Sequence, residues 1–132
     1  MPRDLSQVGT PHDWLRRARS NLVRAKQPKP EEALWEDLCF DAQQAAEKSI
    51  KAVLLAHSIP FRFVHDITEF LTLLEKHGIS LPEEIRVSAE LTDYAVENRY
   101  PGPFEPVTEE EFKSALQIAE AVFAWAESQI EK

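Results

Sequence analysis

The side chains best suited to bind a charged ligand are an arginine near a proline-rich segment and two lysines in the middle of the chain. Arg99 presents a planar fork of donors at the end of an expected helix, and such a fork is one way in which proteins hold a phosphate. The alternative is a structural arginine that holds the proline-rich loop through its own carbonyls or pairs with Asp93 or Glu97. Lys48 and Lys51 form a second candidate ligand site, with a solvated helix face as the alternative.

Aromatic and sulfur side chains add fewer possibilities. Tyr94 and Tyr100 could stack on a base or pack half-buried. Helical bundles usually bind metals through Glu-x-x-His pairs, and none of the four histidines follows a Glu at that spacing. Cys39 stands at the edge of an apolar helical stripe, which favours inert packing. The three glycines are scattered along the chain, so they form no phosphate-binding loop. We therefore expect no metal and no cofactor.

Charge and composition limit the class of protein. The 132 residues hold 15 Lys and Arg against 23 Asp and Glu, a net charge of −8 that argues against a general polyanion binder. Residues 1–30 nevertheless carry a net +5, which leaves −13 for the rest. A single cysteine excludes an internal disulfide and no apolar stretch approaches the roughly 20 residues of a membrane span, so we expect a cytoplasmic protein without membrane segments.

Proline positions and apolar periodicity predict an all-α fold. No segment alternates apolar and polar residues as a half-buried strand would. A first helix should begin at Thr10 with Pro11 and end near Gln27, and a last should follow Thr108 and end near Ile130. The remaining predicted helices run from about Glu31 to His57, from a capping-box pair of Asp66 and Glu69 to Gly78, and from Pro82 to just before Pro101. These lengths predict one domain over residues 1–132, an antiparallel up-and-down bundle of four to five helices whose core covers about 12–130.

The helix predicted over 31–57 should lie at the centre of this bundle. Its apolar arc is mostly Ala and Ser, and small side chains let neighbouring helices approach closely. The other side mixes Asp41, Gln43, Gln44, Glu47, Lys48 and Lys51 with Phe40, Leu54 and Leu55. Glu47 and Lys51 have the spacing of an intrahelical ion pair. The large apolar residues on this side predict a second contact surface.

Three segments together resemble a known family. They are Gln43-Gln44-Ala45-Ala46-Glu47-Lys48 with the following Lys51-Ala52, then His65-Asp66-Ile67, and finally Glu97-Asn98-Arg99-Tyr100-Pro101-Gly102. With the opening Asp13-Trp14-Leu15 and the terminal helix, this order resembles the HEPN domain, the higher eukaryotes and prokaryotes nucleotide-binding family, over about residues 12 to 130.

The resemblance implies a helical bundle, commonly a homodimer, often encoded beside a small nucleotidyltransferase as a toxin–antitoxin pair. Many members are metal-independent ribonucleases in which an Arg and a His, separated by four to six residues, lie at the dimer cleft. The imidazole can move the proton of a ribose 2′-hydroxyl while the guanidinium holds the phosphate. Arg99 stands where that Arg is expected, but Phe104, Glu105 and Pro106 stand where the His should follow.

Three functions remain open on this basis. The first is a dimeric HEPN module, with little or no catalysis, that binds a nucleotidyltransferase and a nucleotide or RNA through Lys48, Lys51, Arg99 and Tyr100. The second is an endoribonuclease toxin that uses Arg99 and a substitute base, His65, whose alternative role is to order the loop before a helix. The third is a helical adaptor without nucleotide contacts.

Overall fold

The computed structural model describes residues 9–96 and 106–131, and its regular elements are all helical. Three long helices are α1 (Pro11–Ala25), α2 (Trp35–Ala56) and α6 (Glu109–Ile130). Shorter elements are α3 (Ile67–Lys76), α4 (Glu83–Arg86), the 3-10 helix η2 (Val87–Thr92) and α5 (Asp93–Val96). The described residues contain no strand, so the all-α bundle predicted from the sequence is confirmed.

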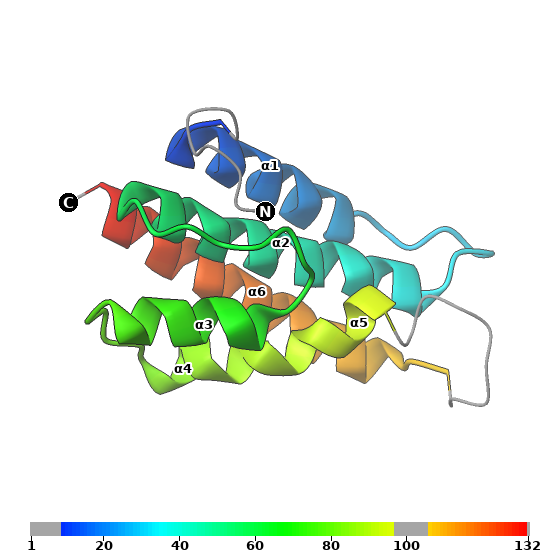
Figure 1. Ribbon diagram of the computed structural model, residues 1–132. Helices are drawn as coiled ribbons and strands as arrows, with labels where there is room; N and C mark the ends of the chain where they lie inside the picture. Colours follow the sequence, from blue (N-terminus) through cyan, green and yellow to red (C-terminus); the bar gives the residue numbers. More distant parts are fainter. Residues whose placement is uncertain (1–8, 97–105, 132) are drawn as a thin grey trace.

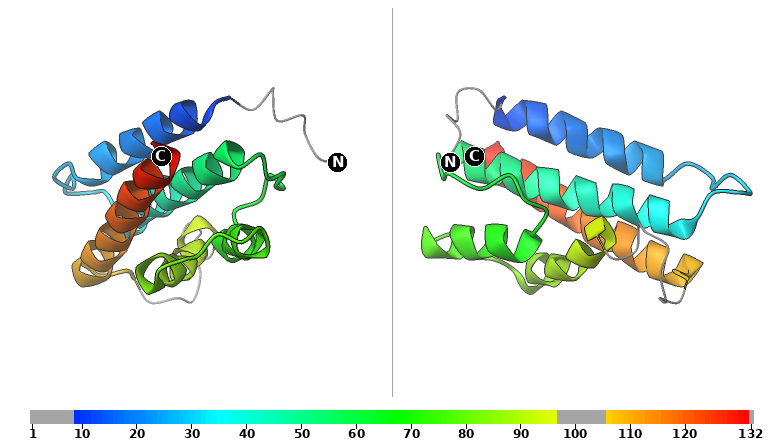
Figure 2. Two further views of the ribbon diagram at one scale, coloured as in Figure 1. Left: turned by 90° about the vertical axis from the view of Figure 1, so that its left-hand side faces the viewer. Right: turned by 45° about the vertical axis from the view of Figure 1, so that its right-hand side comes forward.

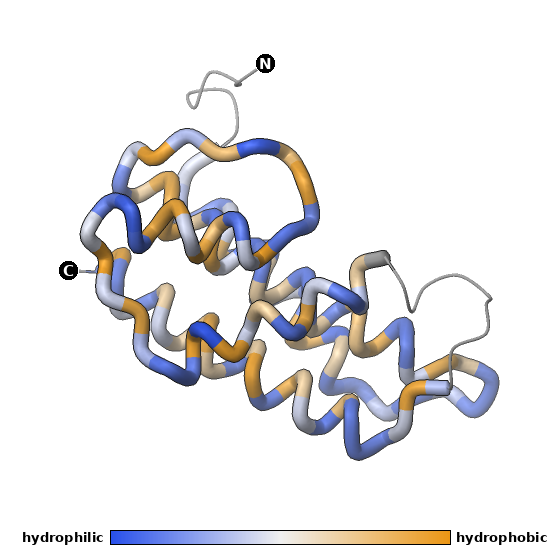
Figure 3. Tube along the Cα trace, turned by 60° about the horizontal axis from the view of Figure 1, so that its bottom comes forward, coloured by the Kyte–Doolittle hydropathy of each residue, from blue (hydrophilic) through white to orange (hydrophobic). Residues whose placement is uncertain are grey.

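Helix α2 is the centre of the bundle. It packs extensively on α1 and α6, and α3 and α5 also contact it. Figures 1 and 2 show α1 and α3 on opposite sides of α2, with α6 alongside. Its Ala42, Ala45, Ala46 and Ala52 are fully buried, as the small apolar arc predicted. Along the trace in Figure 3, hydrophobic and hydrophilic residues alternate within each long helix, as expected for helices with one buried side.

The first helix starts as predicted. The Thr10 hydroxyl accepts from the Asp13 amide at 3.1 Å, and the Asp13 carboxylate accepts from the Thr10 amide at 3.0 Å. Together they form a complete capping box with Pro11 at the first helical position. The backbone and hydroxyl bonds from Thr10 hold the pKa of the Asp13 carboxyl below its usual value.

The start of α2 differs from the prediction by four residues. The helix begins at Trp35 and not at Glu31. The Lys29 ammonium bonds the carbonyl oxygens of Pro30, Glu31 and Ala33, at 3.2, 3.4 and 2.8 Å, and so stabilises a turn in place of a helical start. The ring of Trp35 then stacks on Phe112 of α6, with the ring centroids 5.1 Å apart. A lysine that satisfies local carbonyls therefore overrides the helix-starting signal of Pro30.

The cap of α3 is only half of the predicted capping box. The Asp66 carboxylate accepts from the Glu69 amide at 3.3 Å. The Glu69 carboxylate does not return to the Asp66 backbone, because it pairs with the Arg62 guanidinium, whose Nε lies 3.0 Å away. Gly78 ends the segment with φ +83°, which favours glycine.

The helix predicted from Pro82 is interrupted. It divides into α4, η2 and α5. Buried Ser88 donates its hydroxyl to the carbonyl of Ile85, a local bond that competes with the regular helical pattern. Thr92 accepts from the backbone amide of Ile67 at 3.1 Å, which attaches this segment to the start of α3.

The connection 57–66 determines what covers α2. It runs back along α2, so α3 begins beside the middle of α2 and follows the same direction (Figure 1). Phe61 of this connection is buried and its ring contacts Phe70 of α3 edge-on, with centroids 5.9 Å apart.

No helix in the described ranges combines the length and apolar character that a membrane crossing needs.

Candidate functional site

The polar side of α2 is covered by other parts of the chain. Gln43, Gln44, Glu47 and Lys51 all belong to the buried class, and Lys51 retains only 4% of its surface. Helix α1 packs on one edge of this side and the connection 57–66 packs on the other. The alternative that Lys51 lies on a solvated helix face is therefore wrong. Burying charged side chains is costly unless they are paired and hydrogen-bonded, so their partners define the site.

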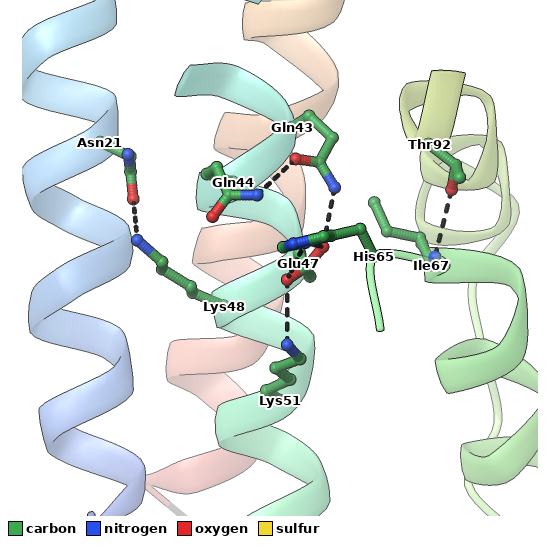
Figure 4. Close-up of polar contacts among 9 residues, drawn as sticks. All are labelled: Asn21, Gln43, Gln44, Glu47, Lys48, Lys51, His65, Ile67 and Thr92. Atoms are coloured by element: carbon green, nitrogen blue, oxygen red, sulfur yellow. Dashed lines mark hydrogen bonds and ion pairs between the residues drawn. The ribbon is translucent and has the colours of Figure 1, made fainter. Parts of the chain in front are cut away.

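Glu47 is the centre of a hydrogen-bonded cluster. Its carboxylate accepts from Gln43 Nε2 at 2.9 Å and from Lys51 Nζ at 2.9 Å (Figure 4). His65 Nδ1 lies 3.0 Å from Oε1 and 3.2 Å from Oε2 of the same carboxylate. Gln44 extends the cluster by donating to Gln43 Oε1 at 2.8 Å. The Glu47–Lys51 ion pair predicted from the spacing is confirmed, and it is buried.

The partner of His65 determines which ring nitrogen carries the proton. An ionised carboxylate only accepts hydrogen bonds, so neutral His65 donates from Nδ1 and keeps its lone pair on Nε2. The side chain of His65 is 56% exposed while that of Glu47 is 2% exposed. A buried carboxylate that orients a partly exposed imidazole is also the arrangement found in acid–base catalysis.

Aromatic rings surround the ammonium of Lys51. The Nζ atom lies 5.2 Å from the ring centroid of Phe70, 5.5 Å from that of Trp14, and 5.8 Å from those of Phe61 and Phe63. Cation–π attraction is strongest where water is excluded, which fits the burial of this ammonium. The rings come from α1, the connection 57–66 and α3, so Lys51 joins three parts of the chain.

A second polar cluster links α1 to α2. Buried Asn21 donates to Asp41 Oδ1 at 3.1 Å and accepts from Lys48 Nζ at 2.9 Å. Arg24 pairs with the same Asp41 at 3.5 Å. Partial burial lowers the pKa of Lys48, and repulsion from the guanidinium of Arg17 adds to this effect. Lys48 therefore points toward α1, away from the Glu47 cluster.

The predicted site residues separate into two groups. Lys48, Lys51 and His65 lie on the side of α2 between α1 and α3, where Glu47 joins Lys51 to His65 (Figure 4). Arg99 and Tyr100 lie outside the described residues, as do Phe104 and Glu105. The described residues therefore establish one cluster and leave the Arg99 turn as a prediction.

Buried Cys39 interacts with half-buried Tyr94 on another side of α2. Cys39 is fully buried and has no disulfide partner. Burial, followed by the negative charges of Glu111 and Glu36, raises the pKa of the Cys39 thiol to about 12. Burial also raises the pKa of Tyr94 to about 12. The thiol stays protonated near neutral pH, which agrees with the packing role predicted for Cys39.

Sequence reasoning missed several residues of these clusters. The spacing of Glu47 predicts only an ion pair, and no sequence pattern assigns Asn21, Trp14 or Phe61 to a site. The spacing Gln43, Glu47, Lys51 places three polar groups on one helical row, which is the available signal for a polar ladder. Within the described ranges, no group of three or more His, Cys, Asp or Glu side chains could hold a metal ion.

The fold and the buried polar core of α2 define a class of all-α bundle proteins, and comparison with known proteins identifies the family. The model of the HEPN domain family matches residues 11–129. The crystal structure of TT1696 from Thermus thermophilus shares 30% sequence identity and a TM-score of 0.76, covering 90% of this chain and 97% of that chain. ST0689, an archaeal HEPN homologue, shares 25% identity and a TM-score of 0.73, covering 93% and 99%.

The chain therefore belongs to the HEPN domain family. No curated protein matches its sequence.

Proposed function

We propose that this HEPN protein is one component of a toxin–antitoxin-like pair with a nucleotidyltransferase. In this role it acts as a homodimeric module that binds its partner and a nucleotide or RNA, without the usual ribonuclease chemistry of the family. A reducing cytoplasm is its proposed location, which is consistent with an unpaired, buried Cys39.

The observation that carries this proposal is that no histidine follows Arg99 at the spacing of the family's catalytic pair. Phe104, Glu105 and Pro106 occupy the positions at which active members carry the catalytic His. A phenyl ring cannot transfer a proton, and a carboxylate at Glu105 would repel a phosphate. The candidate substitute, His65, already has a structural role, because its contact with Glu47 attaches the connection 57–66 to α2.

Two measurements on the full-length protein test the pairing and the dimer. Purification from its own cells, followed by mass spectrometry, should recover a nucleotidyltransferase in a fixed ratio with this chain. Sedimentation of the purified protein in dilute solution should show a dimer. Recovery of the chain without any nucleotidyltransferase would contradict the pairing, and a monomer at all concentrations would contradict the dimer.

The active ribonuclease is a second candidate, and the orientation of His65 favours it. With Nδ1 directed at Glu47, the Nε2 lone pair of His65 is available as a proton acceptor on a half-exposed side chain. Incubation with single-stranded RNA and excess chelator tests this function. Cleavage that is lost in both Arg99→Ala and His65→Ala would support it, whereas no cleavage by the wild-type protein would exclude it.

A further inference from the structure

Helices α1 and α2 present two matching rows of side chains to one another. On α1 the row is Trp14, Arg17, Asn21 and Arg24, and on α2 it is Lys51, Lys48, Gln44 and Asp41. At about 100° per residue each row covers only about 80° of its helix. Three contacts connect the rows in order along their length: Trp14 with Lys51, Asn21 with Lys48, and Arg24 with Asp41. We call these eight residues the α1–α2 seam.

The seam is cationic in a protein that is acidic overall. Four of its eight residues are cations and one, Asp41, is an acid. Beside the seam, Glu47 pairs with Lys51 and the carboxylate of Asp13 interacts with Arg17, which leaves one positive charge. The base of the seam is buried, whereas Arg17 and Arg24 are exposed and Lys48 is half-buried. Two of these cations are held in place from below, Lys48 by Asn21 and Arg24 by Asp41.

Two other basic residues, Arg19 of α1 and Lys26 at its C-terminal end, pair with acids of α6. Arg19 pairs with Glu127 at 3.5 Å and its guanidinium lies over the ring of Phe123. Lys26 pairs with Glu120 at 2.9 Å. The net positive charge of residues 1–30 is thus divided, because Arg19 and Lys26 are paired with α6 while Arg17 and Arg24 face the seam.

Exposed aromatic and imidazole groups adjoin one end of the seam. Phe63 is 45% exposed, and its ring lies 5.8 Å from the Lys51 ammonium, which is itself 5.5 Å from the ring of Trp14. His65, on the same connection, is 56% exposed at its side chain. Aromatic faces beside a row of cations are the combination that binds single-stranded nucleic acid, because bases stack on rings while cations follow the backbone.

The length of the seam indicates a strand in preference to a single anion. Arg17 and Arg24 are seven residues apart, about 10 Å along the helix axis. Successive phosphates of a strand can contact guanidinium groups that are spaced along such a row. The carboxylates of an acidic peptide would pair with the cations, but they would not stack on the ring of Phe63.

We propose that the α1–α2 seam binds single-stranded RNA, with Arg17, Arg24 and Lys48 on its phosphates and Phe63 stacked on a base at one end. This inference rests on the nucleotide- or RNA-binding part of the proposed function and names a surface for it that is separate from the Arg99 turn. It does not depend on cleavage or on the nucleotidyltransferase.

Fluorescence anisotropy of a labelled single-stranded RNA of about 12 nucleotides tests the proposal on the full chain. At about 50 mM salt the wild-type protein should bind, and log K should fall linearly with log salt. Arg17→Gln combined with Arg24→Gln should weaken binding about tenfold or more and reduce the salt slope by about two. Phe63→Ala should weaken binding about fivefold or more and leave the slope unchanged.

Matched controls separate the seam from a general charge or apolar effect. Arg86→Gln removes an exposed arginine of α4, and Leu34→Ala removes an exposed apolar side chain before α2. Both should bind RNA like the wild type. Circular dichroism should show the same helicity for all variants.

Three results would overturn the inference. Equal weakening by Arg86→Gln would show that net charge alone acts, while displacement of RNA by polyglutamate at equal charge concentration would show a site for acidic polypeptides. RNA binding that survives in every seam variant would place the RNA elsewhere on the protein, and the proposed function would remain. Loss of the nucleotidyltransferase or of the dimer is measured separately and would leave the seam result unchanged.

Discussion

The imidazole Nδ1 of His65 lies 3.0 Å from Oε1 of Glu47, although the two residues are 18 positions apart in the sequence. The contact exists because the connection 57–66 runs back along α2, which returns His65 to the middle of that helix (Figure 1). The same carboxylate also accepts hydrogen bonds from Gln43 and Lys51, so His65 is its third partner. One buried side chain therefore links the central helix to the connection that precedes α3.

Replacement of Glu47 should be strongly destabilising. In Glu47→Gln the Lys51 ammonium stays buried without an opposite charge, and breaking one partner of such a pair costs about 3–5 kcal/mol. Urea denaturation followed by circular dichroism would measure the free energy of unfolding. Glu75→Gln is the matched control, because Glu75 pairs with Arg86 at the surface and its loss should cost under about 1 kcal/mol. Equal effects of the two substitutions would contradict the central place of Glu47.

Removal of His65 should act locally. In His65→Ala the connection 57–66 loses its polar contact with α2, while the Glu47–Lys51 pair remains. We expect a loss of about 1 kcal/mol in the free energy of unfolding, the usual worth of one hydrogen bond. Amide hydrogen exchange should accelerate in residues 57–66 and stay unchanged in α6. His77→Ala is a suitable control, since the His77 ring bonds the carbonyl of Leu73, four residues earlier in the same segment, at 2.9 Å. Uniform acceleration over the whole chain would contradict a local role.

Stability should fall in alkaline solution because of Cys39 and Tyr94. Burial raises the pKa of each to about 12, from 9.0 and 10.0 respectively. Between about pH 9 and 12 the unfolded chain has released protons that the folded chain still holds, so the free energy of unfolding decreases as pH rises. The slope approaches about 1.4 kcal/mol per pH unit for the fully buried Cys39 and is smaller for Tyr94, which solvent partly screens. Their stabilising contribution is fully present below pH 9.

Cys39→Ala provides the control for this pH dependence. The variant should lose the part of the slope that begins near pH 9 and keep a smaller part from Tyr94 above pH 10, because Cys39 itself helps to raise the pKa of Tyr94. Thermal denaturation at a series of pH values would resolve the two. An unchanged slope in Cys39→Ala would show that other groups cause the alkaline loss.

The sequence predicts those parts of the fold that depend on local interactions. Thr10 and Pro11 identify the start of α1 because the cap is made by residues within one turn. The alanines of α2 identify its buried side because periodicity alone reveals a helical stripe. The predicted start of α2 was wrong because it depends on Lys29, whose bonds to nearby carbonyls have no pattern in the sequence.

The candidate site depends on contacts that no local pattern reveals. The spacing of Glu47 and Lys51 predicts their ion pair, but their burial results from the return of the connection 57–66 and from the packing of α1. In the sequence, nothing distinguishes Asn21 from other polar residues of α1. Its hydrogen bonds with Asp41 and Lys48 form only when α1 packs on α2. Sequence reasoning could therefore find the residues of α2 but could not determine which of them solvent reaches.

Restoring the missing histidine should restore ribonuclease activity. Phe104→His places an imidazole five positions after Arg99, the shortest spacing of the family motif. Because a general base typically contributes about 10²–10⁴-fold, we expect cleavage of single-stranded RNA in excess chelator to rise at least about hundredfold above the wild-type level. The double variant Arg99→Ala, Phe104→His should return to that level, since the new base would act on a phosphate that no guanidinium holds. Equal rates in the single and double variants would show that the Arg99 turn does not form the site, and no gain at all would show that the cleft has diverged beyond one residue.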